Sequence, residues 1–257
     1  MKIAVCVKQV VARDWPLRVD ESATWVRDSD ASFEMNEPDA YALEEALRLK
    51  EKHGGEVVVC SAGPGRLRQV IREALARGAD RAIHVEDDVL ATADASLVAR
   101  ALSSSLRKEN FDLVLTGLQS DDQGFGQTGV VLAEQMGLPH ATIVMEVDVD
   151  EVEQGRIRVK RELEAGWFQW MSMATPALLT IQSGINQLRY ATLRGIMAAK
   201  KKEVRTESFN DVSEASYRIV GLHAPEKSKK THFVEGTPAE SAATLVRLLR
   251  EEARALR

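Results

Sequence analysis

The stretch LVLTGLQSDDQGFGQTG, residues 113–129, is followed by the apolar-periodic run Val130 to Met136, and this combination decides the fold. It reads as an apolar, β-branched strand, then a glycine-rich loop, then the start of a helix. This order places backbone N–H groups just outside a sheet, where the helix N-terminus carries partial positive charge. The glycines let the backbone approach an anion closely, and the polar side chains add donors. The predicted phosphate contacts come from Gly124, Gly126, Gln127, Thr128 and Gly129.

The loop also matches the dinucleotide fingerprint, since Gly124 to Gly129 reads G-x-G-x-x-G. In a dinucleotide fold the first glycine follows the strand almost at once, whereas here the polar insert Gly117 to Gln123 intervenes. Glu146 supplies an acidic residue at roughly the usual distance, but Asp121 and Asp122 would repel a pyrophosphate unless they face a ribose. We therefore favour a mononucleotide. The alternative is a surface turn that binds no ligand.

The composition is that of an ordinary globular protein. The chain has 257 residues, of which 44% are hydrophobic, and a net charge of -5. This charge argues against a nucleic-acid partner, which usually requires a basic surface. Cys6 and Cys60 lie in apolar segments, so neither a disulfide framework nor a thiolate metal site is expected. Because no secretory leader or membrane-length apolar run is evident, we expect a cytoplasmic protein without direct membrane insertion.

Buried strands alternate with amphipathic helices in the first half of the chain. The predicted strands are Ile3 to Val7, Glu56 to Ala62, Ala82 to Val85 and Phe111 to Thr116, and helices begin near Asn36, Leu67 and Ala91. This alternation predicts right-handed crossovers and a parallel sheet, with ligands at the carboxyl ends of the strands. Asn36 and Ala62 are therefore candidates to share a ligand with the glycine loop. The segment Gln9 to Met35 is predicted to be a long excursion containing a short hairpin.

The pattern changes after Pro139. Ala141 to Val149 and Arg156 to Leu163 predict a hairpin, and Trp167 to Met173 and Ala177 to Gln182 predict two further strands that extend the sheet partly in antiparallel fashion. A short amphipathic helix then carries Leu193, Ile196 and Met197 and runs into Lys200 to Lys202. Two interpretations of this helix stay open, namely an ordinary surface helix and an apolar anchor for a partner protein. Residues 206–236 are polar with little periodicity, and a last amphipathic helix starts at Thr237.

Residues arranged for catalysis are scarce. The five histidines show no metal-ligand spacing, and neither G-x-S-x-G nor a P-loop is present. His84 lies in an apolar strand and is expected to be a core residue. Glu44 and Glu45 share a helix with Arg48 and Lys50, so we expect them on its charged outer face. The chain is therefore not expected to be an enzyme by itself.

Several segments together resemble the electron-transfer flavoprotein β subunit family. The similarity runs in order and with matching spacing from Lys2 to about Arg205. The segments are Met35-Asn36, Leu43 to Glu51, Ala74 to Arg81, Gly126-Gln127-Thr128-Gly129, and Tyr190-Ala191-Thr192-Leu193 with Met197 and Lys200 to Lys202. The resemblance implies an α/β fold of the three-layer, Rossmann-like, adenine-nucleotide α-hydrolase-like group, with a mostly parallel sheet. It places the nucleotide-binding domain at 1–205, and a C-terminal extended arm and terminal helix at 206–257 that pack on a partner subunit.

The resemblance also implies a role in electron transfer. In this family the β subunit holds a structural AMP, and the α subunit of the heterodimer carries the FAD that passes electrons from acyl-CoA and other dehydrogenases, as in fatty acid β-oxidation, to a membrane quinone reductase. Leu193 would be the leucine that docks in dehydrogenases, within a docking segment that includes Tyr190, Ile196 and Met197. The residues that would form the AMP pocket are Cys6, Asn36, Ala62, Gly117, Gln119, Ser120, Asp121, Asp122, Gln123, Gly124, Phe125, Gly126, Gln127 and Thr128, the last three on the phosphate.

The chain departs from the family pattern at a few positions. Gly126 stands where many members have asparagine, and Arg13 and Pro38 stand where some members place aromatics near the flavin. Electron-bifurcating relatives, which oxidise NADH, bind a second FAD in place of AMP. Their Asp-Gly-Asp-Thr-Ala-Gln-Val-Gly loop is absent, which favours AMP. Two alternatives to an AMP-binding electron-transfer subunit stay open: half of a bifurcating flavoprotein, or a nucleotide hydrolase. The hydrolase has less support, because an acid, a base and a nucleophile are lacking near the loop.

Overall fold

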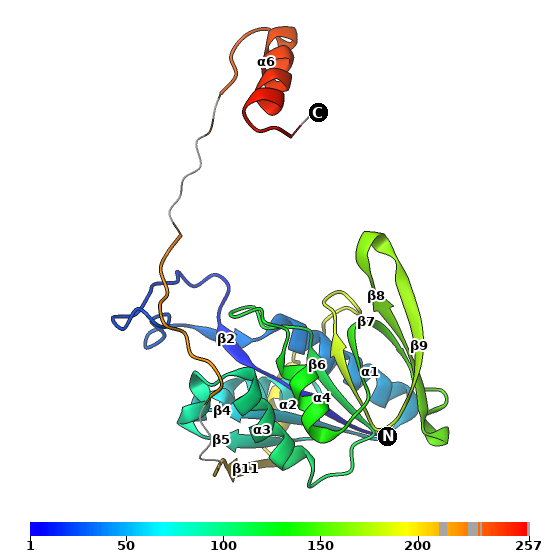
Figure 1. The fold of residues 1–257 in the computed structure, drawn as a ribbon. Coiled ribbons are helices and arrows are strands. Elements are labelled where there is room, and N and C mark those ends of the chain that lie inside the picture. The colour runs from blue at the N-terminus through cyan, green and yellow to red at the C-terminus, as the bar shows by residue number, and fades with distance from the viewer. Residues whose placement is uncertain (211–214, 226–230, 232, 256–257) are drawn as a thin grey trace. The chain divides into compact units, whose positions relative to one another are not determined.

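The computed structural model describes all residues except 211–214, 226–230, 232 and 256–257. Its contacts divide the chain into two compact units, Met1–Gly221 and Leu222–Arg257. The first unit contains the sheets and nearly all helices (Figure 1). The second contains α6 (Pro238–Glu251), which begins with a capping box formed by Thr237 and Glu240.

The larger sheet of the first unit has nine strands in the order β11-β5-β4-β1-β6-β10-β7-β8-β9. Neighbours from β11 to β7 run parallel, and β8 and β9 join them in antiparallel fashion. The strands are β1 (Lys2–Cys6), β4 (Glu56–Gly63), β5 (Arg81–Glu86), β6 (Leu113–Gly117), β7 (His140–Asp148), β8 (Arg156–Glu162), β9 (Phe168–Ala174), β10 (Ala177–Ile181) and β11 (Val204–Ser208). The mostly parallel α/β fold expected from the sequence is confirmed.

Helices cover both faces of the parallel strands, which gives three layers (Figure 1). Side chains of α1 (Glu37–His53) and α2 (Arg68–Arg77) pack on one face, where Leu43 and Ile71 are completely buried. Side chains of α3 (Ala95–Leu106) and α4 (Thr128–Met136) pack on the other face. Each fully buried leucine or isoleucine contributes roughly 1.5–3 kcal/mol. The remaining helices are α5 (Leu193–Ala199), which contacts α2, and the 3-10 turns η1 (Gly65–Leu67), η2 (Asp88–Ala91), η3 (Val152–Gln154) and η4 (Glu164–Gly166).

The long excursion after β1 contains antiparallel pairing, but the strands that pair are at its two ends and do not form the short hairpin that was predicted inside it. Its two ends, β2 (Gln9–Val11) and β3 (Phe33–Met35), pair with each other in a separate antiparallel sheet. Inside the excursion a single bridge joins Val19 and Val26. The excursion therefore returns the chain to the start of α1, close to where it left β1.

Two boundaries expected from the sequence are wrong. Residues 91–94 do not belong to α3, because η2 ends at Ala91 and Asp94 caps a helix that begins at Ala95. Thr206 to Ser208, read as polar arm, complete strand β11 at the edge of the sheet. That strand is held in place by ion pairs of Arg205 with Glu109 and of Glu207 with Lys108, and by Phe209, which packs with Val85 in a small core. Such pairings leave no periodic signal in a local window.

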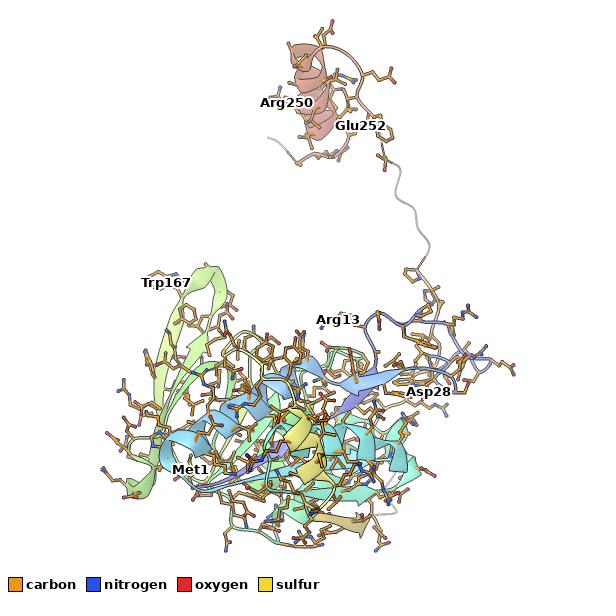
Figure 2. The ribbon with its side chains drawn as sticks, turned by 180° about the vertical axis from the view of Figure 1, so that it is seen from behind. Met1, Arg13, Asp28, Trp167, Arg250 and Glu252 are labelled. Atoms are coloured by element: carbon orange, nitrogen blue, oxygen red, sulfur yellow. The ribbon has the colours of Figure 1, made fainter. Side chains whose placement is uncertain are left out.

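The β8–β9 hairpin carries exposed aromatic side chains. Trp167 at its turn, shown in Figure 2, is 72% exposed, and Phe168 and Trp170 on β9 are also exposed. Lys160 and Arg158 lie over the rings of Phe168 and Trp170. Within the described residues, β9 has no neighbour on its outer side.

A search of the described helices for one with the length and apolar character needed to cross a membrane finds none.

Candidate functional site

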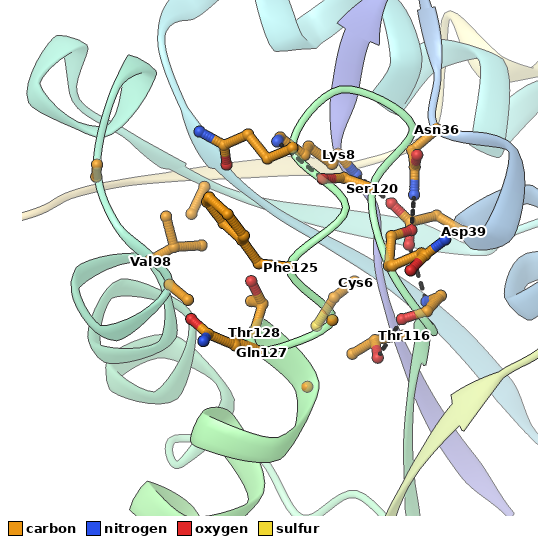
Figure 3. Close-up of a pocket in the computed structure, with 18 of the residues that line it drawn as sticks. Cys6, Lys8, Asn36, Asp39, Val98, Thr116, Ser120, Phe125, Gln127 and Thr128 are labelled. Atoms are coloured by element: carbon orange, nitrogen blue, oxygen red, sulfur yellow. Dashed lines mark hydrogen bonds between the residues drawn. The ribbon is translucent and has the colours of Figure 1, made fainter. Parts of the chain in front are cut away.

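A pocket opens at the carboxyl ends of β1, β4 and β6 (Figure 3). The chain builds β4 and β5 on one side of β1 and then returns to place β6 on the other side, so the pocket lies where the strand order reverses. Its volume is about 950 Å³ with its open mouth included.

Asn36 holds the glycine loop. It occupies the predicted N-cap position of α1, but its side chain does not cap the helix. Its amide nitrogen donates to the backbone oxygen of Gln119 (3.0 Å), and its amide oxygen accepts from the backbone N–H of Asp121 (2.8 Å). Because Asn36 is buried, these two bonds fix the loop over the end of the sheet.

Asp39, one turn into α1, joins the ends of β1 and β6 beneath the pocket. Its two carboxylate oxygens accept from the backbone N–H groups of Lys8 and Gly117, each at 2.8 Å. Burial raises the pKa of Asp39 to about 7, although these donors act in the opposite direction. A Cβ at Gly117 would lie 2.5 Å from Asp39 Oδ1, so only glycine fits there.

The two acidic residues of the loop lie outside the lining of the pocket and are bonded to other groups. Asp121 accepts from the backbone N–H of Glu37, at the start of α1 (3.1 Å). Asp122 pairs with Lys8 Nζ at 2.7 Å. Burial would raise the pKa of Asp122, but the charge of Lys8 and hydrogen bonds lower it below its usual value. Neither carboxylate lines the cavity, so neither would face a phosphate group bound there.

The start of α4 presents donors to the pocket. Gly126 adopts a left-handed conformation with φ of 62° and turns the chain into the helix. Gln127 occupies the N-cap position without a side-chain cap bond, and Thr128 begins the helix. The first N–H groups of a helix lack intrahelical partners and favour anions. Gly129 has a packing role in addition, because a Cβ there would lie 2.6 Å from Thr180 and 2.7 Å from Thr116.

One wall of the pocket is apolar. It comes from η2, the first turns of α3 and the end of β4, and includes Leu90, Val98 and Ala62. Figure 3 shows Phe125 and Val98 on one side of the pocket and Asn36 and Asp39 on the other. A site that combines main-chain donors with an apolar wall suits a ligand that joins an anionic group to a flat ring system.

The structure brings most of the predicted ligand residues together. Those that line the pocket are Cys6, Asn36, Ala62, Gly117, Gln119, Ser120, Gln123, Phe125, Gly126, Gln127 and Thr128. Asp121, Asp122 and Gly124 lie outside its lining. The sequence reasoning missed the lining residues Lys8, Trp25, Asp39, Leu90, Val98 and Tyr217. Asp39 could have been found, since it follows Asn36 by one helical turn at the same sheet edge.

The segment 190–199 is exposed and apolar in the way a docking surface requires. Tyr190 is 89% exposed and Leu193 76%, and Met197 and Ile196 are exposed beside them. Thr192 caps α5 by accepting from the N–H of Gly195 at 3.0 Å. Isolated side chains of this type are unremarkable on a surface, but a group of them on one short helix forms an apolar patch.

Side chains that precede the segment anchor it to α1. Arg189 binds Glu44 through two hydrogen bonds of 2.8 and 2.9 Å and also reaches Glu51. Asn186 donates to Glu45 at 3.1 Å. The expectation that Glu44 and Glu45 occupy a charged outer face is therefore wrong, because both are buried. Hydrogen bonding to Glu51 and Glu44 raises the pKa of Arg189. Burial raises the pKa of Glu45.

Contacts with α2 hold the other end of the segment. Lys202 Nζ donates to the backbone oxygens of Leu75 and Ala79 at the end of α2 (2.9 and 2.5 Å). A cation suits the negative end of a helix dipole. A Cβ at Gly195 would lie 2.2 Å from the backbone oxygen of Ala76, so the close approach of α5 to α2 requires glycine.

Other reactive side chains are buried structural groups. Cys6 and Cys60 are buried and unpaired, and burial raises the pKa of both thiols, that of Cys60 to about 12. His84 is buried, and its Nε2 lies 3.0 Å from the backbone oxygen of Gly63, as expected of a core residue. In the part of the chain that the structure describes, no group of three or more histidine, cysteine or acidic side chains is arranged to hold a metal.

Comparisons with known proteins agree with this architecture. The family described as the electron transfer flavoprotein domain matches residues 24–212. The chain is 37% identical over 262 residues to the electron transfer flavoprotein subunit beta of Methylophilus methylotrophus, with 98% of each chain covered. It is 34% identical over 239 residues to the protein of the same name from Bacillus subtilis, covering 90% of this chain and 91% of the relative. The corresponding protein of Sus scrofa is 35% identical over 260 residues, covering 98% and 97%.

Proposed function

Because the chain belongs to the electron transfer flavoprotein family as a β subunit, we propose that its pocket holds a structural AMP and that it docks dehydrogenases for a flavin-bearing α subunit. The FAD would be held mainly by that α subunit and would pass electrons toward a membrane quinone reductase. The chain itself performs no catalytic step in this proposal. Its role is to hold a nucleotide, to pair with the α subunit and to present a docking surface.

The observation that carries the AMP proposal is that the pocket combines free main-chain donors at the start of α4 with an apolar wall. Gly126, Gln127 and Thr128 would hold the phosphate at the start of α4. The adenine would lie against the apolar wall near Val98, where burial of its flat faces is favourable. Because Asp121 and Asp122 are already bonded to Glu37 and Lys8, the phosphate meets no free carboxylate from the loop.

The ligand is identified by its release. We would purify the chain with its α subunit, denature the heterodimer and analyse the released small molecules by mass spectrometry. One AMP and one FAD per heterodimer would support the proposal. Two FAD molecules without AMP would support the bifurcating alternative, and the absence of any adenine nucleotide apart from the FAD of the α subunit would overturn the AMP site.

A matched pair of glycine variants tests the phosphate end. Gly126→Ala and Gly137→Ala both force a side chain into a left-handed conformation, since φ is 62° and 70° at these positions. The strain costs roughly 1–2 kcal/mol in each case. Gly126 lines the pocket and Gly137 ends the same helix on its far side. We expect only the Gly126 variant to lose AMP, and equal loss from both variants would contradict the proposed phosphate seat.

The docking proposal concerns Leu193, with Tyr190, Ile196 and Met197 around it. We expect Leu193→Ala to slow electron transfer from a dehydrogenase and to leave the AMP content unchanged, because the side chain is exposed and far along the chain from the loop. Val89→Ala, which shortens an exposed apolar side chain elsewhere, serves as the control. An unchanged rate for the Leu193 variant would remove this assignment.

We further propose that the chain beyond Arg205 contributes to the heterodimer through its arm and terminal helix. The helix α6 carries exposed apolar side chains, Leu245 and Val246 among them. Truncation after Gly221 keeps β11 and the first compact unit whole. We expect this truncation to release the α subunit in gel filtration, and a stable complex would contradict the role of the arm. The cytoplasmic location expected from the sequence stays a prediction.

A further inference from the structure

Tyr217, which comes after β11 in the chain, lies at the pocket. Tyr217 lines the pocket together with Phe125 of the glycine loop, although the two residues are far apart in the chain. Their rings meet edge to face, with centroids 5.7 Å apart and planes at 89°. Such aromatic pairs contribute beyond the area that they bury. Both rings keep substantial exposure, 52% for Phe125 and 41% for Tyr217, so a flat ligand in the pocket would find aromatic surface available at its mouth.

Asp94 fixes this segment to the body of the first unit. One carboxylate oxygen accepts from the N–H of Leu97 at 2.8 Å and caps α3. The other accepts from the backbone N–H groups of Ser216 and Tyr217, the latter at 3.3 Å. Burial would raise the pKa of Asp94, but these donors keep it below its usual value, so the group is ionised at neutral pH. Asp94 is buried and does not line the pocket.

We propose that Tyr217 closes the nucleotide pocket and that Asp94 is the positioning residue that holds it there. Nucleotide retention and docking of residues 215–217 are then coupled, so that each stabilises the other. Thermodynamic linkage makes this coupling reciprocal, because any free energy that the docked segment adds to nucleotide binding is returned as tighter docking. The inference rests on the proposed function, since it takes a nucleotide as the occupant of the pocket.

The coupling links the pocket to the C-terminal part of the chain. Tyr217 precedes the second compact unit by only a few residues, and the polypeptide continues directly from one to the other. In an empty pocket the ring of Tyr217 keeps its edge-to-face contact with Phe125. An occupied pocket adds the face of the base, so a bound nucleotide makes the start of the arm more rigid.

The variant Asp94→Asn separates the anchor from the ligand contact. Asparagine caps helices as well as aspartate does, so α3 keeps its N-cap through the amide oxygen. The amide nitrogen, however, replaces the oxygen that accepts from the N–H groups of Ser216 and Tyr217. Because this nitrogen is itself a donor, both hydrogen bonds are lost. In the α/β heterodimer, we expect this variant to release AMP about tenfold faster, which corresponds to the loss of one well-packed aromatic wall.

Two variants of the ring complete the test. Tyr217→Ala should release AMP as fast as the Asp94→Asn variant. Tyr217→Phe keeps the ring and loses only the hydroxyl and its hydrogen bond to the backbone of Ala95, so it should release AMP more slowly than Tyr217→Ala. Val220→Ala, at an exposed position in the same segment, is the control. Amide hydrogen exchange at Ser216 and Tyr217 in the wild-type heterodimer should slow when AMP is added to nucleotide-depleted protein.

The outcomes distinguish this inference from the proposed function. Wild-type heterodimer that contains no AMP would defeat the proposed function, and the inference with it. Wild-type heterodimer that contains AMP, combined with unchanged release from both the Asp94→Asn and the Tyr217→Ala variants, would overturn the inference alone. Faster release from Tyr217→Ala but not from Asp94→Asn would likewise overturn the positioning role of Asp94. Exchange at residues 216 and 217 that does not respond to AMP would overturn the coupling.

Discussion

The glycine loop at 117–128 and the docking segment at 190–199 are both held by α1, but by different means. The loop is fixed by Asn36 and Asp39, whose side chains bond to backbone groups of the loop and of the strand ends. The docking segment is fixed through Arg189 and the carboxylates of Glu44 and Glu51. One helix therefore positions a concave site near its start and an exposed surface further along.

The two regions are held by different kinds of contact because one faces a pocket and the other faces solvent. The loop faces a pocket, where short polar side chains satisfy buried backbone groups and exclude free charges. The docking segment must keep apolar side chains in water, so its fixation comes from the residues before and after it and leaves the surface itself free. If this comparison is right, each region can be damaged without harming the other.

The largest effect is expected from Arg189→Gln. It leaves the buried carboxylate of Glu44 without its cation, which costs about 3 kcal/mol of unfolding free energy. The docking segment loses its anchor, so binding must order it first, and we expect about tenfold weaker docking of a dehydrogenase. Stopped-flow electron transfer measures this change, and AMP content should be normal. Arg48→Gln makes the same charge change at an exposed position of α1 and serves as the control. Loss of AMP in the Arg189 variant would break the comparison.

Asn36→Ala should produce the opposite pattern. It removes both hydrogen bonds that hold the glycine loop and leaves their partners at Gln119 and Asp121 unsatisfied, for a loss of about 2 kcal/mol. We expect most AMP to be lost during purification, while docking of a dehydrogenase to the remaining loaded heterodimer is unchanged. Mass spectrometry and urea unfolding provide the two measurements. Retention of AMP at the wild-type level would show that the loop does not depend on α1.

The pocket should contribute a pH dependence of stability through Asp39. The folded pKa of Asp39, about 7, lies above its unfolded value of 3.8, so its contribution to stability is complete below pH 4 and is lost as pH rises through 7. Between pH 5 and pH 8 this loss is on the order of 2 kcal/mol. Asp39→Asn cannot ionise and should flatten the unfolding profile over that interval. An equal slope in the variant would assign the dependence to another group.

The smallest effect is expected from Lys202→Met. It keeps the length of the side chain but removes the ammonium that binds the backbone oxygens of Leu75 and Ala79. The loss of a cation at a helix end costs about 0.5–1 kcal/mol. We expect about a twofold decrease in docking and no change in AMP. Lys201→Met, one position earlier, is the matched control, and equal effects of both would count against a specific anchor.

The order of strands and helices could be predicted from the sequence because each element has a local pattern of apolar and polar residues. Apolar runs such as Ile3 to Val7 and the glycine loop before Val130 identify a parallel α/β sheet and one edge of its ligand site. The residues at which the strands and helices begin and end were harder to predict. The polar strand β11 has no apolar run, and it is defined by its pairing with β5 and by its ion pairs to Lys108 and Glu109, which follow α3.

The buried and pocket-lining residues that could not be predicted from the sequence are placed by long-range contacts. Glu44 is separated by 145 positions from Arg189, so its helix pattern gave no sign that it would be buried. Tyr217 reaches the pocket from a segment without periodicity, and Lys8, which lines the pocket just beyond the end of β1, pairs with Asp122, 114 positions further along the chain. Pairwise contacts of this type depend on the fold as a whole and cannot be read from spacing.

The outer edge of β9 has a consequence for production of the chain. Its main-chain amides and carbonyls face solvent beside the indole rings of Trp167 and Trp170. An uncovered edge of this type is a template for strand addition between identical molecules. We therefore expect the isolated chain to precipitate as concentration rises, and co-expression with the α subunit to be the practical route to homogeneous material.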